Sequence, residues 1–183
     1  KRPTILIGTD TRASSEMLGA AVSAGICSAG ASVIMLGVVP TPAVALLTKL
    51  CNADAGVMIS ASHNPFEYNG IKIFNADGFK LPDELEEEIE DIILGVEETA
   101  AEPPTGGGIG RIIYKDDAVK CYIDHIKSTA NVSFEGLNIA IDCANGSSAV
   151  SAEQLFVDLG ATVHMLSNHP NGVNINKDCG STH

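Results

Sequence analysis

The residues best suited to chemistry stand together in one short stretch, Ser60-Ala-Ser-His-Asn-Pro-Phe-Glu-Tyr-Asn-Gly-Ile-Lys72. It places hydroxyl, imidazole, amide and amine groups between two apolar runs, 56–59 and 71–74, which we expect to be strands. Ligands of α/β proteins bind at the carboxyl ends of strands, and this loop leaves such an end. It is therefore a candidate site for phosphate. On these residues alone a plain turn remains the alternative, because Ser, Asn and Pro are common turn formers.

A family resemblance gives the loop a more specific interpretation. The string Gly56-Val-Met-Ile-Ser-Ala-Ser-His-Asn-Pro65, followed by Asn69-Gly-Ile-Lys72, resembles the active-serine signature of the α-D-phosphohexomutases. Similarity to that family extends over nearly the whole chain, through Ile7-Gly-Thr-Asp-Thr-Arg12, Gly37-Val-Val-Pro-Thr-Pro42, Ile141-Asp-Cys-Ala-Asn-Gly146, Asn174-Ile-Asn176 and Cys179-Gly-Ser-Thr-His183. The serine string and the final string are most similar to the branch that acts on glucosamine phosphates. Tyr68 is slightly more similar to the residue at this position in the branch that acts on mannose and glucose phosphates.

The resemblance implies a phosphoenzyme that interconverts glucosamine 6-phosphate and glucosamine 1-phosphate through a 1,6-bisphosphate, with Ser62 as the carrier of the phosphoryl group. Phosphoryl transfer depends mostly on positioning and charge neutralisation, so donors and cations are needed around the serine. Two alternatives remain. The substrate could be a mannose or glucose phosphate, or the chain could be a phosphosugar-binding module that does not catalyse turnover.

Four further residues are candidates for the site. Lys72 is expected to return beside Ser62 as a positive donor and proton shuttle, with a surface lysine on an edge strand as the alternative. His63 is expected to bond phosphate or orient the loop. Arg12 could bind phosphate as a bidentate donor, or it could form an ion pair with Asp10 that holds the loop. Asn64 is a second candidate phosphate ligand, although it could equally be a loop former.

The family also uses Mg²⁺, and the resemblance implies that Ser62 supplies one ligand once it is phosphorylated. The remaining ligands belong to an Asp-Gly-Asp-x-Asp-Arg loop that this sequence does not contain. We therefore expect the other metal ligands outside this chain. We also expect the 183-residue chain alone to be inactive, because a metal and phosphate-binding groups that stabilise the transition state are missing from it.

Composition excludes several classes of partner. A net charge of −12 with only 11 Lys and Arg argues against nucleic acid and against anionic membranes. The five cysteines are scattered and never form a C-x-x-C pair, so we expect buried free thiols in a reducing cytoplasm. The partner that we expect is a phosphosugar substrate, and open sheet edges could also pair two copies into a homo-oligomer.

Short apolar runs alternate with helical patterns, which predicts an α/β fold with parallel or mixed sheets covered by helices. The inward face of the first helix is expected to carry Met17, Leu18, Ala21, Val22, Gly25 and Ile26. Residues 102–110 have linker composition, with two Pro and four Gly. We predict two consecutive units, both incomplete: 1–98 with the serine loop, a linker at 99–109, and a second sheet within 110–183 that begins with a strand around Ile112.

Overall fold

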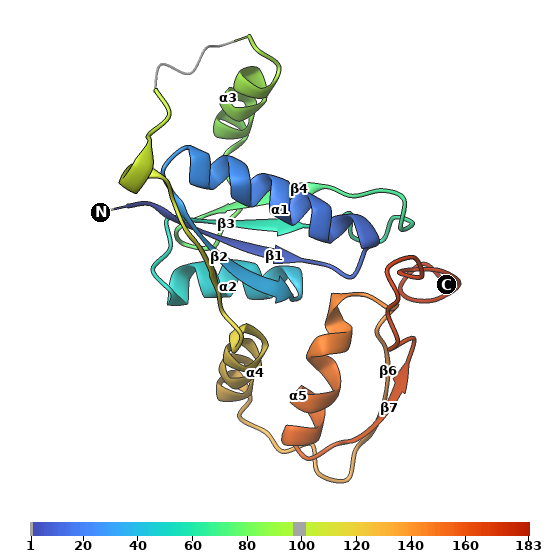
Figure 1. The fold of residues 1–183 in the computed structure, drawn as a ribbon. Helices are drawn as coiled ribbons and strands as arrows, with labels where there is room; N and C mark the ends of the chain where they lie inside the picture. The colour runs from blue at the N-terminus through green and yellow to red at the C-terminus, as the bar shows by residue number, and fades with distance from the viewer. Residues whose placement is uncertain (1, 97–101) are drawn as a thin grey trace.

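The structure is a computed structural model that describes residues 2–96 and 102–183. Its larger sheet, called here the first sheet, has the strand order β4-β3-β1-β2-β5. All neighbours pair in parallel except β3 and β4, which are antiparallel. The five strands are β1 (Thr4–Thr9), β2 (Ser32–Val38), β3 (Ala55–Ile59), β4 (Ile71–Asn75) and β5 (Ile112–Tyr114). The carboxyl ends of β1 and β3 therefore lie at the same edge of the sheet (Figure 1).

Helices α1 (Ala13–Ser28) and α2 (Thr41–Leu50) cover opposite faces of the first sheet (Figure 1). The α2 face is closed by Leu6, Leu36, Val44, Leu47 and Met58, all buried. Pro follows Thr at the start of α2, where the missing N–H of Pro42 is not needed in the first turn. Because helices cover both faces of the sheet, side chains on both faces of the inner strands are buried, and these strands are continuous apolar runs in the sequence.

The prediction for the inner face of α1 is right in part. Leu18, Val22 and Ile26 are half-buried and pack against the core, whereas Met17 is 65% exposed. The most deeply buried stripe was not predicted: it consists of the small residues Ser15, Gly19, Ser23 and Cys27, spaced four apart and therefore on one face of the helix. The face toward the sheet combines this stripe with the apolar side chains beside it.

A second sheet consists of the parallel pair β6 (Asn138–Asp142) and β7 (Thr162–Leu166). The short helix η2 (Ser147–Val150) and α5 (Ala152–Asp158) connect these two strands, and α4 (Ala118–Thr129) packs against both α2 and α5. The predicted fold class, helix-covered mixed and parallel sheets, is confirmed.

One strand lies in a different sheet from the one expected. The strand around Ile112, predicted to open the second unit, is β5, and it pairs with β2 at the edge of the first sheet. Gly110, the first residue after the predicted linker, is also packed against α1 and the turn that follows it: its N–H donates to the Cys27 carbonyl, and a β-carbon on it would lie 1.7 Å from the Ala31 carbonyl oxygen. Residues 99–101 of that linker lie outside the described residues, and the division into two units stays a proposal.

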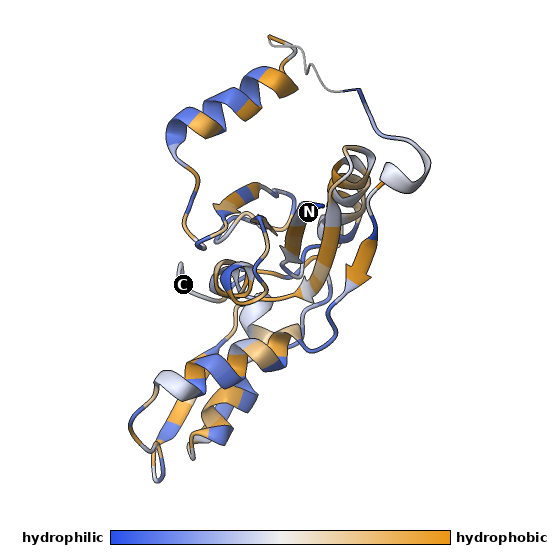
Figure 2. Cartoon of the chain, turned by 90° about the vertical axis from the view of Figure 1, so that its left-hand side faces the viewer, coloured by the Kyte–Doolittle hydropathy of each residue, from blue (hydrophilic) through white to orange (hydrophobic). Residues whose placement is uncertain are grey.

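Helix α3 (Asp83–Ile93) follows Pro82 and has no buried residue. Its apolar side chains Leu85, Ile92 and Ile93 are exposed, Ile93 at 76%, and Figure 2 shows the helix standing apart with mixed polar and apolar colouring. Within residues 2–96 and 102–183, no helix combines the length and apolar character needed to cross a bilayer. All five cysteines are free, and Cys27, Cys143 and Cys179 are buried.

Candidate active site

The serine loop, residues 60–70, leaves the carboxyl end of β3 and returns as β4. Its base is closed by a hydrogen bond from the Ser60 N–H to the Gly70 carbonyl, 2.9 Å. Asn69 fixes the returning arm, because its side-chain nitrogen donates to Ser14 and Ser15 at the start of α1. The loop is therefore attached at both arms to the edge where β1 and β3 end.

Ser62 lies at the exposed tip of this loop in the left-handed backbone region, at φ 56°. A residue other than glycine rarely adopts this conformation, which costs about 1–3 kcal/mol unless its surroundings stabilise it. Its N–H donates to the hydroxyl oxygen of Ser60 at 3.1 Å. The strained backbone holds the Ser62 side chain at the surface, which is where a nucleophile needs to be.

Arg12 supplies most of that stabilisation from the end of β1. Its guanidinium is fully buried and forms an ion pair with Asp10, 2.8 Å from Nε to Oδ2. Its other four N–H groups donate to backbone carbonyls of the serine loop, those of Ser62, Asn64, Pro65 and Tyr68. All five donors of the side chain are therefore engaged within the protein.

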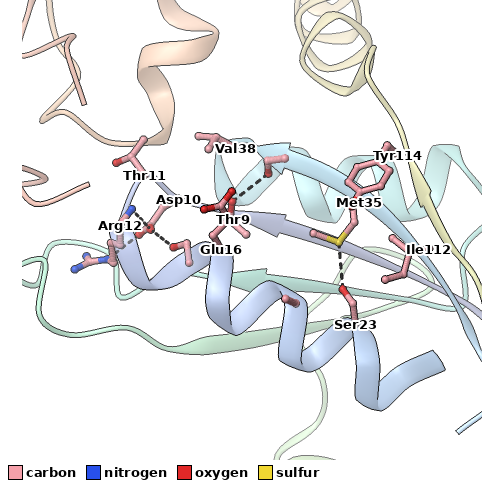
Figure 3. Close-up of a pocket in the computed structure, with 13 residues that line it drawn as sticks. Thr9, Asp10, Thr11, Arg12, Glu16, Ser23, Met35, Val38, Ile112 and Tyr114 are labelled. Carbon is pink, nitrogen blue, oxygen red and sulfur yellow. Dashed lines mark hydrogen bonds and ion pairs between the residues drawn. The ribbon is translucent and has the colours of Figure 1, made fainter. Parts of the chain in front are cut away.

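This geometry decides between the two expectations for Arg12. The ion pair with Asp10 that holds the loop is observed, and no donor of Arg12 is left for a phosphate group. The Asp10 carboxylate also accepts hydrogen bonds from the Arg12 N–H and from the Ser15 hydroxyl, so it is fully engaged as well. Figure 3 shows this cluster at the amino-terminal end of α1.

The second sheet contributes the opposite side of the site. After β7, residues 167–183 form a closing loop that reaches the end of the first sheet (Figure 1). The Ala13 N–H at the start of α1 donates to the Gly172 carbonyl of this loop, and Asn176 donates to the serine loop. The turn after β6 adds a further contact, because the Thr11 hydroxyl donates to the Asn145 carbonyl. Residues more than 100 positions apart are thereby joined around Ser62.

A pocket of about 340 Å³ opens between the two loops. The first sheet and its connections line it with Asp10, Pro40, Thr41, Ser60, Ser62 and His63, and the second with Asp142, Cys143, Ala144, Gly146, Ser147, Ser148, Ile175, Asn176, Gly180 and Ser181. Many of these carry hydroxyl, amide or backbone donors, and α2 begins at the pocket with Thr41, where the helix dipole favours an anion. The pocket therefore suits a small polar, anionic ligand.

Two titratable groups in the pocket have perturbed pKa values. The backbone N–H groups of Gly180 and Ala144 donate to the Asp142 carboxylate, each at 2.8 Å, and lower its pKa. Burial raises the pKa of the Cys143 thiol, so it stays protonated at neutral pH and is a poor nucleophile. Between Ser62 and Cys143, Ser62 is therefore the better placed nucleophile.

A larger pocket, of about 490 Å³, lies on the α1 side of the first sheet (Figure 3). Its walls include the apolar side chains of Met35, Val38 and Ile112. Its polar groups at Asp10, Arg12 and Ser15 are bonded to one another. Such a pocket offers little to a phosphate group, so its greater size does not make it the stronger candidate.

The predicted site residues separate into three positions. Ser62 and His63 are exposed and share the pocket between the loops. Lys72 is exposed on β4 in register with Met58 and does not line that pocket, although it lies only one residue from the strand end at Ile71. Asn64 contributes its carbonyl to the Arg12 cluster, which is the behaviour of a loop former.

The metal expected from the resemblance does not fit the chain by itself. Within the part of the chain that the structure describes, no three His, Cys, Asp or Glu side chains gather as a metal site. The two carboxylates that line the pocket, Asp10 and Asp142, already accept several hydrogen bonds each.

The comparisons with known proteins agree on the family. The family description "Phosphoglucomutase/phosphomannomutase, alpha/beta/alpha domain I" matches residues 1–100. Curated relatives named phosphoglucosamine mutase include those of Ruminiclostridium cellulolyticum, 54% identical over 99% of this chain, and Acetivibrio thermocellus, 56% identical over 99%. The chain spans about 40% of the length of each of these relatives.

Solved structures agree on the fold. A putative phosphomannomutase from Thermus thermophilus superposes with a TM-score of 0.77 at 24% identity, covering 94% of this chain and 39% of its own. A phosphoglucomutase/phosphomannomutase family protein from Burkholderia thailandensis gives 0.74 at 24% identity, covering 93% and 37%. Fold and site define a helix-covered α/β protein with an exposed serine at the carboxyl end of an inner strand. The chain belongs to the phosphoglucomutase/phosphomannomutase family.

Proposed function

We propose that the whole protein is a phosphoglucosamine mutase in which Ser62 carries the phosphoryl group. The observation that carries this proposal is the held serine: an exposed Ser62 in a left-handed conformation whose carbonyl accepts two side-chain hydrogen bonds. Identity of 54–56% to relatives with that name supports the choice of sugar.

In the proposed reaction, the phosphoryl group leaves Ser62 Oγ and is transferred to the 1-hydroxyl of glucosamine 6-phosphate. The bond from Oγ to phosphorus breaks, a bond from the sugar oxygen to phosphorus forms, and the hydroxyl proton passes to a base. The bisphosphate then turns round, the bond from the sugar 6-oxygen to phosphorus breaks as a bond from Ser62 Oγ to that phosphorus forms, and the base returns the proton to the 6-oxygen. The products are glucosamine 1-phosphate and the original phosphoenzyme, so phosphoryl groups and protons balance over the cycle.

The roles of the neighbouring residues follow from their positions. His63 shares the pocket with Ser62 and is the nearest candidate for a hydrogen bond to phosphate or for the base. Lys72 can serve as the cation if its flexible stem brings the ammonium group around the strand end. Arg12 acts through the loop backbone and is a positioning residue. The carbonyl of Asn64 is engaged by Arg12 and Asn176, so its proposed contact with phosphate would be made by its exposed side chain.

Magnesium belongs to the proposal as a cofactor of the whole protein, with phosphorylated Ser62 as the one ligand that this chain would supply. The proposed substrate is a phosphosugar, and the proposed location is the cytoplasm. A homo-oligomer formed through open sheet edges, such as that of β5, also stays a prediction.

The test compares turnover of glucosamine 6-phosphate and mannose 6-phosphate by the whole protein. We expect a clear preference for the glucosamine substrate. Equal or faster turnover of mannose 6-phosphate would move the protein to the other branch of the family. Tight binding of both sugars with no turnover of either would favour the non-enzymatic binding module.

A further inference from the structure

Asn176 stands in the closing loop but directs its side chain at the serine loop. Its backbone is left-handed, at φ 58°, and its N–H donates to the Ala144 carbonyl at 2.8 Å, directly after β6. The residue is half-buried, between the fully buried Ile175 and the exposed Lys177. Its position is therefore set by the second sheet.

Both hydrogens of the Asn176 amide go to the serine loop. Nδ2 donates to the Ser62 carbonyl at 2.9 Å and to the Asn64 carbonyl at 3.0 Å. An amide nitrogen has two hydrogens, so its donor capacity is fully used on the backbone around the proposed nucleophile.

The same two carbonyls also accept hydrogen bonds from Arg12. The distances from Nη2 are 3.0 Å to Ser62 and 2.9 Å to Asn64. A carbonyl oxygen has two lone pairs, so one donor from each sheet saturates each of these oxygens. Arg12 comes from the end of β1 and Asn176 from beyond β7. The backbone of the strained serine is therefore held between the two sheets.

We propose that Asn176 is a positioning residue for phosphoryl transfer from Ser62, and that through it the loop geometry depends on how the second sheet is seated. This proposal rests on the proposed function. Transfer between oxygens needs the reacting atoms in line, so a small displacement of the serine backbone reduces the rate. Asn176 lines the pocket, but its two amide hydrogens are both used on the carbonyls of Ser62 and Asn64, so it would act on the rate through the serine backbone.

The substitution Asn176→Gly separates the side chain from the backbone conformation. Glycine adopts positive φ without a steric penalty, so the variant removes the two donated hydrogen bonds and leaves the turn undisturbed. Asp178→Gly is the matched control, because Asp178 has φ 52° in the same loop and a carboxylate cannot donate to a carbonyl. Asn176→Asp keeps the shape but replaces the donor by an acceptor.

The first measurement is amide hydrogen exchange of residues 60–70 in the 183-residue chain. We expect exchange in this segment to rise about tenfold in Asn176→Gly, as the loss of one to two net hydrogen bonds would give. Asp178→Gly should leave it unchanged. Equal exchange in the Asn176→Gly and Asp178→Gly variants would overturn the proposal, since Asn176 would then not hold the loop.

The second measurement is the rate of the whole protein. We expect kcat to fall about tenfold to a hundredfold in Asn176→Gly and in Asn176→Asp. KM should change by less than about threefold, because the substrate contacts are retained. A purely structural residue would not separate kcat from KM in this way. Faster exchange with an unchanged kcat would also overturn the proposal. If the wild-type protein converts no phosphosugar, the proposed function fails instead, and the exchange comparison alone decides whether Asn176 holds the loop.

Discussion

The serine loop and the closing loop meet at one pocket, but their backbones are held in different ways. In the serine loop, side chains from elsewhere, Arg12 and Asn176, bind the carbonyls, and Ser62 and His63 remain exposed. In the closing loop, part of the support comes from the loop itself, where Asn174 accepts the Asn171 N–H. The rest comes from the end of β6 and the turn after it, where Asp142 and Asn145 accept the N–H groups of Gly180 and His169.

This difference indicates where chemistry can occur. A loop held by external donors keeps its own side chains available for a ligand. The closing loop spends several of its own polar side chains on backbone, Asn171 and Asn174 within the loop and Asn176 on the serine loop, so it serves as a wall and as an anchor. The comparison assigns catalysis to the serine loop and positioning to the closing loop, and each assignment can be broken by experiment.

The largest effect is expected from Ser62→Ala in the whole protein. Removing the hydroxyl removes the carrier of the phosphoryl group, so turnover should fall at least about a thousandfold. The rate of glucosamine 1-phosphate formation measures this, and circular dichroism should show an unchanged fold because Ser62 is exposed. A variant that keeps near-normal turnover would place the nucleophile elsewhere.

The 183-residue chain alone contains both loops and should still show no measurable turnover. The described residues form no metal cluster, and the proposed reaction needs more charge neutralisation than the pocket offers. The same assay, with the whole protein as positive control, tests this. Intact mass should show either the bare chain or one added phosphoryl group at Ser62. Robust turnover by the chain would mean that the two loops are sufficient.

A smaller but still large effect is expected from Arg12→Met. The variant leaves the buried Asp10 carboxylate without its cation and removes one donor from each of four loop carbonyls, so the free energy of unfolding should fall by about 3–5 kcal/mol. Urea denaturation of the chain measures it. Lys120→Met, which removes an exposed ion pair with Asp124, should cost less than about 1 kcal/mol. Similar losses in both variants would mean that Arg12 does not anchor the loop.

The sequence predicts the strands well because each is an apolar run bounded by turn residues. It misplaces two features for physical reasons. The apolar residues Leu18, Val22 and Ile26 of α1 were placed correctly, but the most deeply buried stripe includes Ser15, Gly19 and Ser23, which give no hydrophobic signal. The strand β5 is three residues long, and its partner β2 is chosen by tertiary hydrogen bonding that local pattern does not contain.

The site was predictable only in part. The motif marks Ser62, but the choice for Arg12 between phosphate and the loop depends on which acceptors surround it in the fold. Asn176 belongs to the string Asn174-Ile-Asn176, which carries part of the family resemblance but indicates no role for this residue. Asparagine tolerates positive φ and has two amide hydrogens, which is a usable signal, but its partners lie 112 and 114 residues away.

The smallest effect concerns Asp142, which anchors the closing loop to the end of β6. In Asp142→Asn, an amide group replaces one of the two oxygens that accept N–H groups from Gly180 and Ala144. One donor then faces another donor, so we expect the free energy of unfolding near pH 7 to fall by about 1 kcal/mol, a modest value because the residue is exposed.

The pH dependence of that loss identifies its cause. The two backbone donors lower the pKa of Asp142 in the folded chain, with Gly180 contributing most. A lowered pKa stabilises the fold fully above the unfolded-state value, about pH 4, and this stabilisation disappears as pH falls through the folded-state value. The difference between wild type and Asp142→Asn should therefore be constant from about pH 5 to 7 and shrink below about pH 4. Urea denaturation across this range measures it, with Asp116→Asn as a surface control. A difference that stayed constant into acid would show that the ionised carboxylate does not anchor the closing loop.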